Sequence, residues 1–270
     1  MDKKRDNLKI LKMIDKNEKH YTKKDVIADL PFRMVVVGKS QLSGKTNFSA
    51  FILLSPSWYL NDFEGDNIFL ISGSVENDKK LQILIEEKEI PPSNIYPDFD
   101  EELLEATYEM IEQEFKEDID EGRKPKNYLW YLDDMSYKGD LKSSNFGIIN
   151  KAFSNGRHIN LSVILTAQKY TDILTSAREN MTMGIFFNCS ERQLDSINDD
   201  INYLTDRKSF KKHFRQACKE KHSFFVVNFS NDKEEMYLDS NFKPITMIDK
   251  NIDNNIKPPQ EEKVYSYNND

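Results

Sequence analysis

A glycine-bounded loop near the start of the chain has the residue types of a phosphate-binding site. It follows the apolar run 33–37 and ends in Gly-Lys-Thr at residues 44–46, where we expect a helix to begin. Backbone N–H groups of such a loop can surround phosphate oxygens, and the positive N-terminal end of the helix points at them. We expect Lys45 to reach the β- and γ-phosphates and the Thr46 hydroxyl to bind Mg²⁺. The residues expected to contact a nucleotide are Gly38, Lys39, Ser40, Gln41, Leu42, Ser43, Gly44, Lys45, Thr46 and Asn47.

The spacing of the two glycines departs from the usual pattern. Phosphate loops place four residues between the first glycine and the Gly-Lys pair, whereas Gly38 and Gly44 have the five residues 39–43 between them. The first glycine is therefore displaced by one position. The alternative interpretation of this segment is an ordinary strand-to-helix turn with a surface lysine.

Two adjacent carboxylates end a second strand. The apolar and aromatic run 128–132 leads into Asp133 and Asp134, which indicates a strand buried on both faces. At the carboxyl edge of a parallel sheet, the two acids would lie beside the phosphate loop. We expect Asp133 to hold Mg²⁺ directly or through water. We expect Asp134 to orient and deprotonate the water that attacks the γ-phosphate.

A glutamine follows a third apolar strand. The strand expected over residues 161–166 leads to Gln168, whose neutral amide can sense the γ-phosphate or hold the attacking water. A glutamine at a strand end is usually only a polar surface residue. The continuation to Arg178 and Asn180, just before the next strand, favours a functional role.

Strands and helices alternate through most of the chain. We expect strands over residues 33–37, 67–72, 128–134, 161–166, 183–188 and 223–229. We expect helices over residues 45–54, 77–88, 101–117, 146–153, 176–180, 191–201 and 205–218. Repeated strand–helix units with apolar strands predict an α/β fold with a mostly parallel sheet, helices on both faces, and ligands at the carboxyl ends of the strands.

Composition divides the chain into three parts. Residues 1–30 are rich in lysine and only weakly periodic, so we expect an N-terminal arm. Residues 31–240 carry the alternating pattern and form the expected phosphate-loop domain. Residues 241–270 are polar, and the abundance of Asn, Asp, Lys, Pro and Gln from residue 251 onward predicts a disordered tail.

Composition also excludes several classes of protein. The 270 residues are 38% hydrophobic, enough to bury a substantial core. The two cysteines and four histidines lack metal-ligand spacing, so we expect no zinc site and a reducing compartment. Because no apolar run approaches the length of a membrane span and the N-terminus is charged, we expect a soluble, unsecreted protein.

The net charge of −8 hides a strong sorting of charge along the chain. Residues 98–121 hold twelve carboxylates and one lysine, and their apolar residues fall at helical spacing, so we expect a solvated acidic helix face. Residues 206–222 hold seven Lys or Arg against two acids, which indicates either a solvated helix face or a surface for DNA phosphates. The candidate DNA contacts in this segment are Arg207, Lys208, Lys211, Lys212 and Arg215.

Together these motifs resemble those of the DNA-packaging ATPases of the FtsK-HerA superfamily, particularly the enzymes of poxviruses, giant viruses, virophages and related membrane-containing viruses. The resemblance covers roughly residues 32–229. It rests on the phosphate loop, on Leu-Asp-Asp at 132–134, and on a block that runs from Gly-Arg-His at 156–158 through Thr-Ala-Gln at 166–168 to Arg-Glu-Asn at 178–180. This last block is the most specific, because its order and spacing look like the glutamine strand, loop and arginine-asparagine helix of these motors.

The resemblance implies a RecA-like phosphate-loop NTPase core, a homo-oligomeric ring, and Mg²⁺-dependent ATP hydrolysis that drives double-stranded DNA into a preformed capsid. It also implies a capsid or inner-membrane partner, and a location at the assembly site in the host cytoplasm or in the virion. Members of the family usually keep the regular glycine spacing. The extra residue here leaves the exact backbone cradle open, although Gly44, Lys45 and Thr46 match residue by residue.

Ring members of the family also supply an arginine to the ATP of the neighbouring subunit. A cation placed there can be worth about 10³ or more in rate. Arg178 is the first candidate for this role and Arg157 the second. For both residues, an ordinary salt bridge or helix cap is the alternative.

A translocating motor also needs moving groups that touch DNA. Lys138 and Lys142 lie in the loop after the acidic pair, where they can respond to the nucleotide and contact the DNA backbone. A plain flexible loop is the alternative, and the basic segment 206–222 is the competing surface. Contacts to phosphates predict binding that tolerates any DNA sequence and weakens with salt.

Two other functional classes remain open. A kinase for a small acceptor also uses a phosphate loop, but it would need an acceptor pocket, and Gln168 and the paired acids would have no obvious role in it. A non-catalytic assembly protein would bind ATP without turnover, although pure binding does not require Asp134. Small acceptors should stimulate a kinase, long duplex DNA should stimulate a motor, and neither should stimulate a binding protein.

Overall fold

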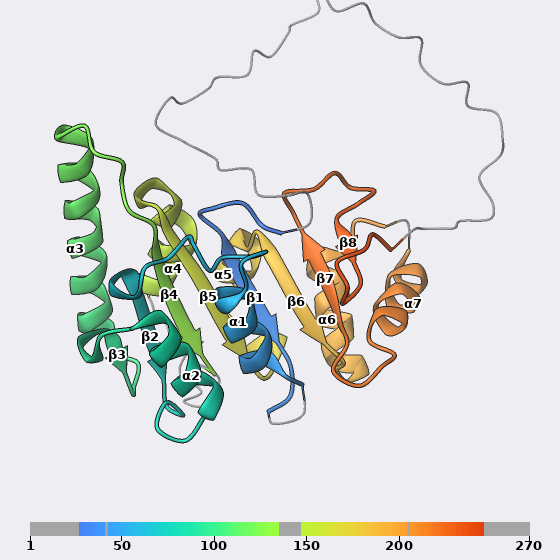
Figure 1. Cartoon of the computed structure of the whole chain (residues 1–270). Coiled ribbons are helices and arrows are strands. Elements are labelled where there is room, and N and C mark those ends of the chain that lie inside the picture. The colour runs from blue at the N-terminus through green and yellow to red at the C-terminus, as the bar shows by residue number, and fades with distance from the viewer. Residues whose placement is uncertain (1–26, 41–42, 135–146, 205, 246–270) are drawn as a thin grey trace, which may run out of the picture.

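The computed structural model describes residues 27–40, 43–134, 147–204 and 206–245, and its centre is an eight-stranded sheet (Figure 1). The strand order is β3-β2-β4-β5-β1-β6-β7-β8. Strands β1 to β6 run parallel, β7 pairs antiparallel with β6, and β8 pairs antiparallel with β7. The predicted mostly parallel α/β sheet is therefore confirmed. The strands are β1 (Arg33–Val37), β2 (Ile68–Ser72), β3 (Ile95–Tyr96), β4 (Tyr128–Asp133), β5 (Leu161–Ala167), β6 (Met183–Phe187), β7 (Phe224–Asn228) and β8 (Tyr237–Leu238).

Helices cover both faces of the sheet, as predicted. Side chains of α1 and α2 belong to one buried apolar cluster, and those of α3 to α7 belong to a second cluster on the other face (Figure 1). The α-helices of the described residues are α1 (Lys45–Leu54), α2 (Lys79–Lys88), α3 (Glu101–Asp120), α4 (Gly147–Asn155), α5 (Thr175–Asn180), α6 (Glu191–Ile201) and α7 (Arg207–Ala217).

The strand that leads into the phosphate loop is buried on both sides. Met34 and Val36 pack into the cluster under α1, while Val35 and Val37 pack into the opposite cluster. This two-sided burial explains why β1 is an uninterrupted apolar run rather than an alternating one. Because β5 and β6 flank β1, the loop that follows it lies near the middle of the sheet's carboxyl edge.

The packed chain extends beyond the expected limits of the domain. Ile27, Ala28 and Leu30 are buried, and Tyr59 Oη donates a 2.7 Å hydrogen bond to the Ala28 carbonyl. After β8, the ring of Phe242 packs 4.5 Å from that of Trp58, measured between centroids. The division of the chain at residues 30 and 240 otherwise stays a prediction.

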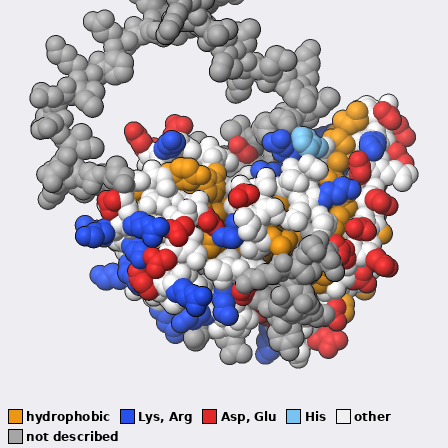
Figure 2. All heavy atoms as spheres, turned by 180° about the vertical axis from the view of Figure 1, so that it is seen from behind, with side chains coloured by type: hydrophobic (Ala, Val, Ile, Leu, Met, Phe, Trp, Pro, Cys, Tyr) orange, Lys and Arg blue, Asp and Glu red, His pale blue; other side chains and the backbone are white. Residues whose placement is uncertain are grey.

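Charge is sorted in space as well as in sequence. Figure 2 shows acidic side chains along the flank formed by α3, and lysines and arginines mixed with acids on the opposite flank, over α6 and α7. Among the helices of the described residues, none is both long and apolar enough to cross a membrane.

Candidate nucleotide-binding site

The phosphate loop begins as a continuation of β1. The Gly38 N–H donates a 3.1 Å hydrogen bond to the Ala167 carbonyl, so the pairing with β5 extends one residue past the strand. At the other end of the loop, Gly44 has a φ of 101°, a left-handed conformation that glycine adopts without strain, and α1 begins at the next residue. Gln41 and Leu42 lie outside the described residues.

The displaced first glycine has a packing role. A Cβ at Gly38 would lie 2.6 Å from Ser43 Cβ and 3.0 Å from Phe187 Cβ. Ser43 is held in this position by a 2.8 Å hydrogen bond from its hydroxyl to the Lys39 carbonyl. Ser43 therefore packs against the end of β1, and only a residue without a side chain fits at position 38.

Lys45 lies inside the loop. Its ammonium donates a 2.7 Å hydrogen bond to the Gly38 carbonyl, and the residue is only 6% exposed. Burial lowers the pKa of Lys45, while the charges of Asp134 and Asp133 act in the opposite direction. An ammonium group carries three donors, so the bond to Gly38 leaves Lys45 able to contact phosphate oxygens as well.

Asp133 is held at the carboxyl ends of three neighbouring strands. Ser72, at the end of β2, donates a 3.1 Å hydrogen bond to Oδ2, and Thr166, in β5, donates a 2.9 Å hydrogen bond to Oδ1. Burial raises the pKa of Asp133, while both hydroxyl groups act to lower it. The carboxylate is therefore fixed in orientation by its neighbours on either side of β4.

Asp134 turns the chain at the end of β4. Its φ of 50° lies in the left-handed region, which Asp and Asn tolerate better than most residues. Its backbone N–H donates a 2.8 Å hydrogen bond to Thr166 Oγ1, and Gln168 Nε2 donates a 3.0 Å hydrogen bond to Oδ2. The second carboxylate oxygen, Oδ1, is buried and has no hydrogen-bond partner among the described residues.

One cavity of about 1070 Å³ joins the loop and the acids, which is large enough for a nucleotide. Gly38 and Lys39 do not line it, and Lys39 instead lines a neighbouring cavity of about 310 Å³. Gln168 reaches the site through Asp134. The predicted site residues that line the larger cavity are Ser40, Ser43, Gly44, Lys45, Thr46, Asn47, Asp133 and Asp134.

The donor set suits Mg²⁺ bound together with phosphates. The cavity offers the Thr46 hydroxyl and the Asp133 carboxylate, both hard oxygen ligands of the kind that Mg²⁺ prefers. Across the described stretches, no three His, Cys, Asp or Glu side chains are grouped to hold a metal ion. Mg²⁺ is usually bound by one or two protein ligands together with water and substrate phosphates, and Thr46 and Asp133 would be the protein ligands here.

Sequence reasoning missed three contributors to the site. Ser72 and Thr166 position the two acids, and His222 places Nδ1 3.3 Å from the Ser43 carbonyl oxygen of the loop. The signal for Ser72 and Thr166 was present, because each is a hydroxyl residue near the carboxyl end of a buried strand. His222 lies in the segment before β7 and has no local signal.

Arg178 does not lie at the nucleotide-binding site of its own chain. It pairs with Asp200, donates a 3.1 Å hydrogen bond to Thr175 Oγ1, and lies 5.0 Å from the centroid of the Tyr170 ring. The end of α5 lies at the amino edge of the sheet, because the carbonyl of Asn180 accepts a hydrogen bond from Arg33 at the start of β1. Arg157 precedes β5 and lies at the same edge.

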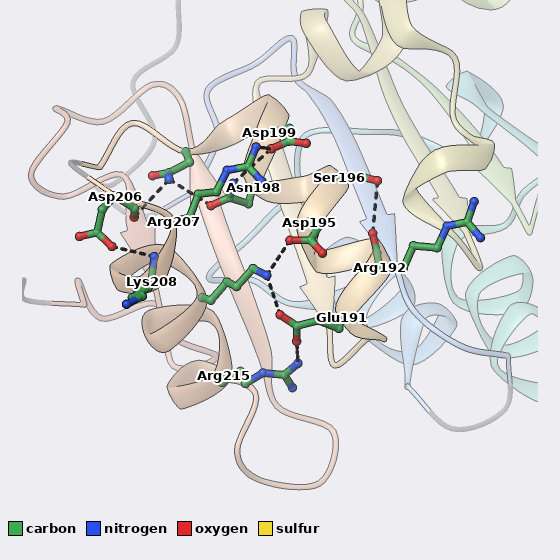
Figure 3. Close-up of polar contacts among 12 residues, drawn as sticks. Glu191, Arg192, Asp195, Ser196, Asn198, Asp199, Asp206, Arg207, Lys208 and Arg215 are labelled. Carbon is green, nitrogen blue, oxygen red and sulfur yellow. Dashed lines mark hydrogen bonds and ion pairs between the residues drawn. The ribbon is translucent and has the colours of Figure 1, made fainter.

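Most of the predicted DNA contacts on α7 are paired with α6 (Figure 3). Arg207 lies 2.5 Å from Asp199, Lys211 lies 2.6 Å from both Glu191 and Asp195, and Arg215 also pairs with Glu191. Lys208 and Lys212 form no ion pair within the described part of the chain. The other two candidates, Lys138 and Lys142, lie outside the described residues.

Sequence comparison identifies the family. Residues 18–260 match the family described as Poxvirus A32 protein. The chain belongs to the A32 family. This confirms the resemblance to viral packaging ATPases that the motifs indicated. No curated protein sequence matches the chain.

Several solved structures share the fold of this chain. B204, the DNA-packaging ATPase from Sulfolobus turreted icosahedral virus, has a TM-score of 0.51 and 13% identity, over 74% of this chain and 94% of that chain. The genome packaging NTPase B204 from Sulfolobus turreted icosahedral virus 2, in complex with AMP, has a TM-score of 0.51 and 14% identity, over 74% of this chain and 93% of that chain. The pCW3 conjugation coupling protein TcpA with ATPγS has a TM-score of 0.51 and 12% identity, over 75% of this chain and 58% of that chain. The predicted RecA-like phosphate-loop NTPase core is confirmed.

Proposed function

We propose that this A32-family chain is an ATP-hydrolysing motor that moves double-stranded DNA into a viral capsid. The observation that carries the proposal is the meeting of Lys45, Asp133 and Asp134 at one cavity beside the phosphate loop. Membership of the A32 family supports the viral setting. The two B204 proteins that share the fold are described as a DNA-packaging ATPase and a genome packaging NTPase.

Each side chain of the site has a distinct role in this proposal. The Lys45 ammonium binds oxygens of the β- and γ-phosphates, while Thr46 and Asp133 hold Mg²⁺. Mg²⁺ bound there would neutralise part of the negative charge of the phosphates. Asp134 orients a water molecule through Oδ1 and accepts its proton as the water oxygen bonds to the γ-phosphorus and the bond to the leaving ADP oxygen breaks. Gln168 holds the other carboxylate oxygen of Asp134 in place.

The working form in this proposal is a homo-oligomeric ring around DNA, docked on a capsid or inner-membrane component at the assembly site in the host cytoplasm. Arg178 lies at the edge of the sheet opposite its own phosphate loop. It is therefore better placed to reach the ATP of a neighbouring subunit than the ATP of its own. On α7, Lys208 and Lys212 are the cations left for DNA phosphates after the pairing with α6.

Steady-state hydrolysis tests the proposal directly. The purified chain is assayed with ATP and Mg²⁺, with and without long double-stranded DNA, at low and high salt. DNA should stimulate turnover, and the stimulation should fade as salt screens the phosphate contacts. The Lys45→Ala variant is the control for contaminating ATPases. Hydrolysis that responds to a small acceptor but not to DNA would contradict a motor and indicate a kinase.

A further inference from the structure

The cavity at the phosphate loop continues onto a wall of aromatic rings. We name these four cavity-lining residues the aromatic platform: Phe51 on α1, Trp58 after α1, Phe224 at the start of β7, and Phe242 after β8. Phe51 is 55% exposed, which is unusual for a phenylalanine. An exposed aromatic surface next to a phosphate site needs an explanation, because large apolar groups open to water commonly mark binding sites.

The platform is held together by its own packing. The Phe242 ring lies 4.5 Å from Trp58 and 6.0 Å from Phe224, centroid to centroid. Phe48, which is almost fully buried, packs 5.2 Å from Phe224 and supports the platform from the core side. The rings of Trp58, Phe224 and Phe242 come from segments far apart in sequence, yet they pack together and line the same cavity, which Phe51 also lines.

The sheet order gives the direction in which a nucleotide must lie. The acids that act on the γ-phosphate follow β4, two strands from β1 on one side. Phe224 begins β7, two strands from β1 on the other side. A triphosphate that runs from the acids across the phosphate loop therefore directs its nucleoside end toward the platform.

The other end of the cavity has a different character. Behind the acids, it is lined by polar and charged residues of the segment between β2 and α2. These residues are Ser74, Asn77 and Asp78 of that segment, together with Lys79 and Lys80 in the first turn of α2. The aromatic end therefore suits a flat, largely apolar base, and the charged end suits the phosphates and the attacking water.

We propose that the aromatic platform binds the base of the nucleoside triphosphate by stacking, and that purines are preferred because their rings are larger. The inference rests on the proposed function, in which the phosphate loop holds the triphosphate. A platform of this kind recognises the face of a base, since every base has a π-face. The segment after β8 then becomes part of the nucleotide site, through Phe242 and Ser240.

Calorimetric titration with two ligands distinguishes the contribution of the platform to binding from that of the phosphate loop. The ligands are ATP and inorganic tripolyphosphate, both with Mg²⁺, because they share the phosphates and differ in the nucleoside. The wild-type chain should bind ATP about tenfold more tightly than tripolyphosphate. Trp58→Ala and Phe242→Ala should each weaken ATP binding about tenfold and leave tripolyphosphate binding unchanged.

Two further variants guard against trivial explanations. Tyr203→Ala removes an aromatic ring that is 54% exposed and does not line the cavity, so it should change neither affinity. Phe51→Ala removes an exposed ring of the platform, so it tests stacking even where a more buried substitution prevents folding.

Tryptophan fluorescence gives an independent reading. The chain has two tryptophans, and Trp130 is fully buried in the core, so a change on adding ATP reports Trp58. ATP should change the emission and tripolyphosphate should not. Trp58→Phe should keep the ATP affinity and lose the signal.

The possible failures are distinguishable. The platform proposal would be wrong if the wild-type chain bound ATP and tripolyphosphate with equal affinity. It would also be wrong if Trp58→Ala and Phe51→Ala weakened the binding of both ligands equally. Neither result would contradict the proposed phosphate site. Failure of the wild-type chain to bind either ligand would overturn the proposed function itself, and the platform with it.

Discussion

Thr166 Oγ1 donates a 2.9 Å hydrogen bond to Asp133 Oδ1. The same oxygen accepts the backbone N–H of Asp134 at 2.8 Å. One buried hydroxyl on β5 therefore fixes the carboxylate expected to hold Mg²⁺ and the backbone of the expected general base. Thr166 contacts neither nucleotide nor water in the proposed mechanism, so it is a positioning residue.

Replacing this hydroxyl should slow turnover more than it weakens binding. Thr166→Val keeps the shape of the side chain and removes both hydrogen bonds, and a hydrogen bond to a charged group is worth about 1.5–3 kcal/mol. We expect kcat to fall about tenfold or more, with little change in the KM for ATP. Thr166→Ser should restore most of kcat, and equal losses in the two variants would show that packing rather than the hydroxyl matters.

The roles of Lys45 and Asp134 are separable. Lys45→Ala and Asp134→Asn should each abolish hydrolysis, while Asp134→Asn should still bind nucleotide. Asparagine is a fair replacement because it tolerates a φ of 50° and its amide oxygen can accept the bond from Gln168. Turnover and ATP affinity are measured on the same preparation, and full hydrolysis by Asp134→Asn would falsify its assignment as the base.

Arg178 is tested by mixing subunits. Arg178→Ala chains have an intact phosphate loop, and Lys45→Ala chains have an intact arginine, so mixed rings should recover partial hydrolysis if the arginine acts on a neighbour. Asp200→Asn is the matched control, because it removes the ion-pair partner and keeps the guanidinium. If mixed rings form without recovery, and both single variants lower the Tm equally, then Arg178 is a structural residue.

The cations of α7 should divide into two groups. Lys208 and Lys212 are four residues apart on one face and have no ion pair among the described residues, so Lys208→Ala with Lys212→Ala should reduce DNA stimulation without lowering the Tm. Lys211→Ala should lower the Tm and leave DNA stimulation unchanged, because it breaks the pairs with Glu191 and Asp195. The assay is hydrolysis against DNA concentration beside thermal unfolding, and equal effects of both changes on stimulation would contradict the division.

The contacts of Glu114 predict that the stability of the fold depends on pH. The bonds from Lys126, at 2.8 Å, and from Tyr128 lower the pKa of Glu114 in the folded chain. A lowered pKa stabilises the fold fully above the unfolded value of about 4.3, and this stabilisation disappears as the pH falls through the lower folded value. Denaturant unfolding should therefore show Glu114→Gln less stable than wild type at pH 7, with the difference vanishing in acid.

The exposed Glu105 of the same helix provides the control for that measurement. Glu105→Gln removes a carboxylate from α3 without touching Lys126 or Tyr128. The difference in stability between Glu105→Gln and wild type should not shrink as the pH falls. Parallel behaviour of the two variants would mean that the total charge of α3, rather than the Glu114 contacts, sets the pH dependence.

Much of the fold could be predicted because its elements carry local patterns. The bounds of β1 and α1 agree with the expected 33–37 and 45–54, since an apolar run and a glycine-terminated loop mark them. The two-residue strands β3 and β8 were not predicted. Such short strands are defined by their pairing with β2 and β7 rather than by their own residues.

The site was predictable where chemistry coincides with a strand end. Lys45, Asp133, Asp134 and Gln168 meet because parallel strands deliver their last residues to one edge. Thr166 has the signal of a hydroxyl near the end of a buried strand, but that signal does not show that it bonds both Asp133 and Asp134. Trp58 and Phe242 could not be joined from sequence, since only the packed chain brings the end of α1 and the residues after β8 together.

The central place of β1 has a consequence for how the protein is made. Its partners β5 and β6 lie more than a hundred residues further along the chain, as in the pairing of Arg33 with Val163 and of Met34 with Met183. On the ribosome, β1 therefore emerges before both of its neighbours, and it cannot form its sheet pairing until β5 and β6 have been synthesised. The phosphate loop is therefore translated before both strands that flank β1, so a nascent chain can complete its nucleotide site only after β6 has been synthesised.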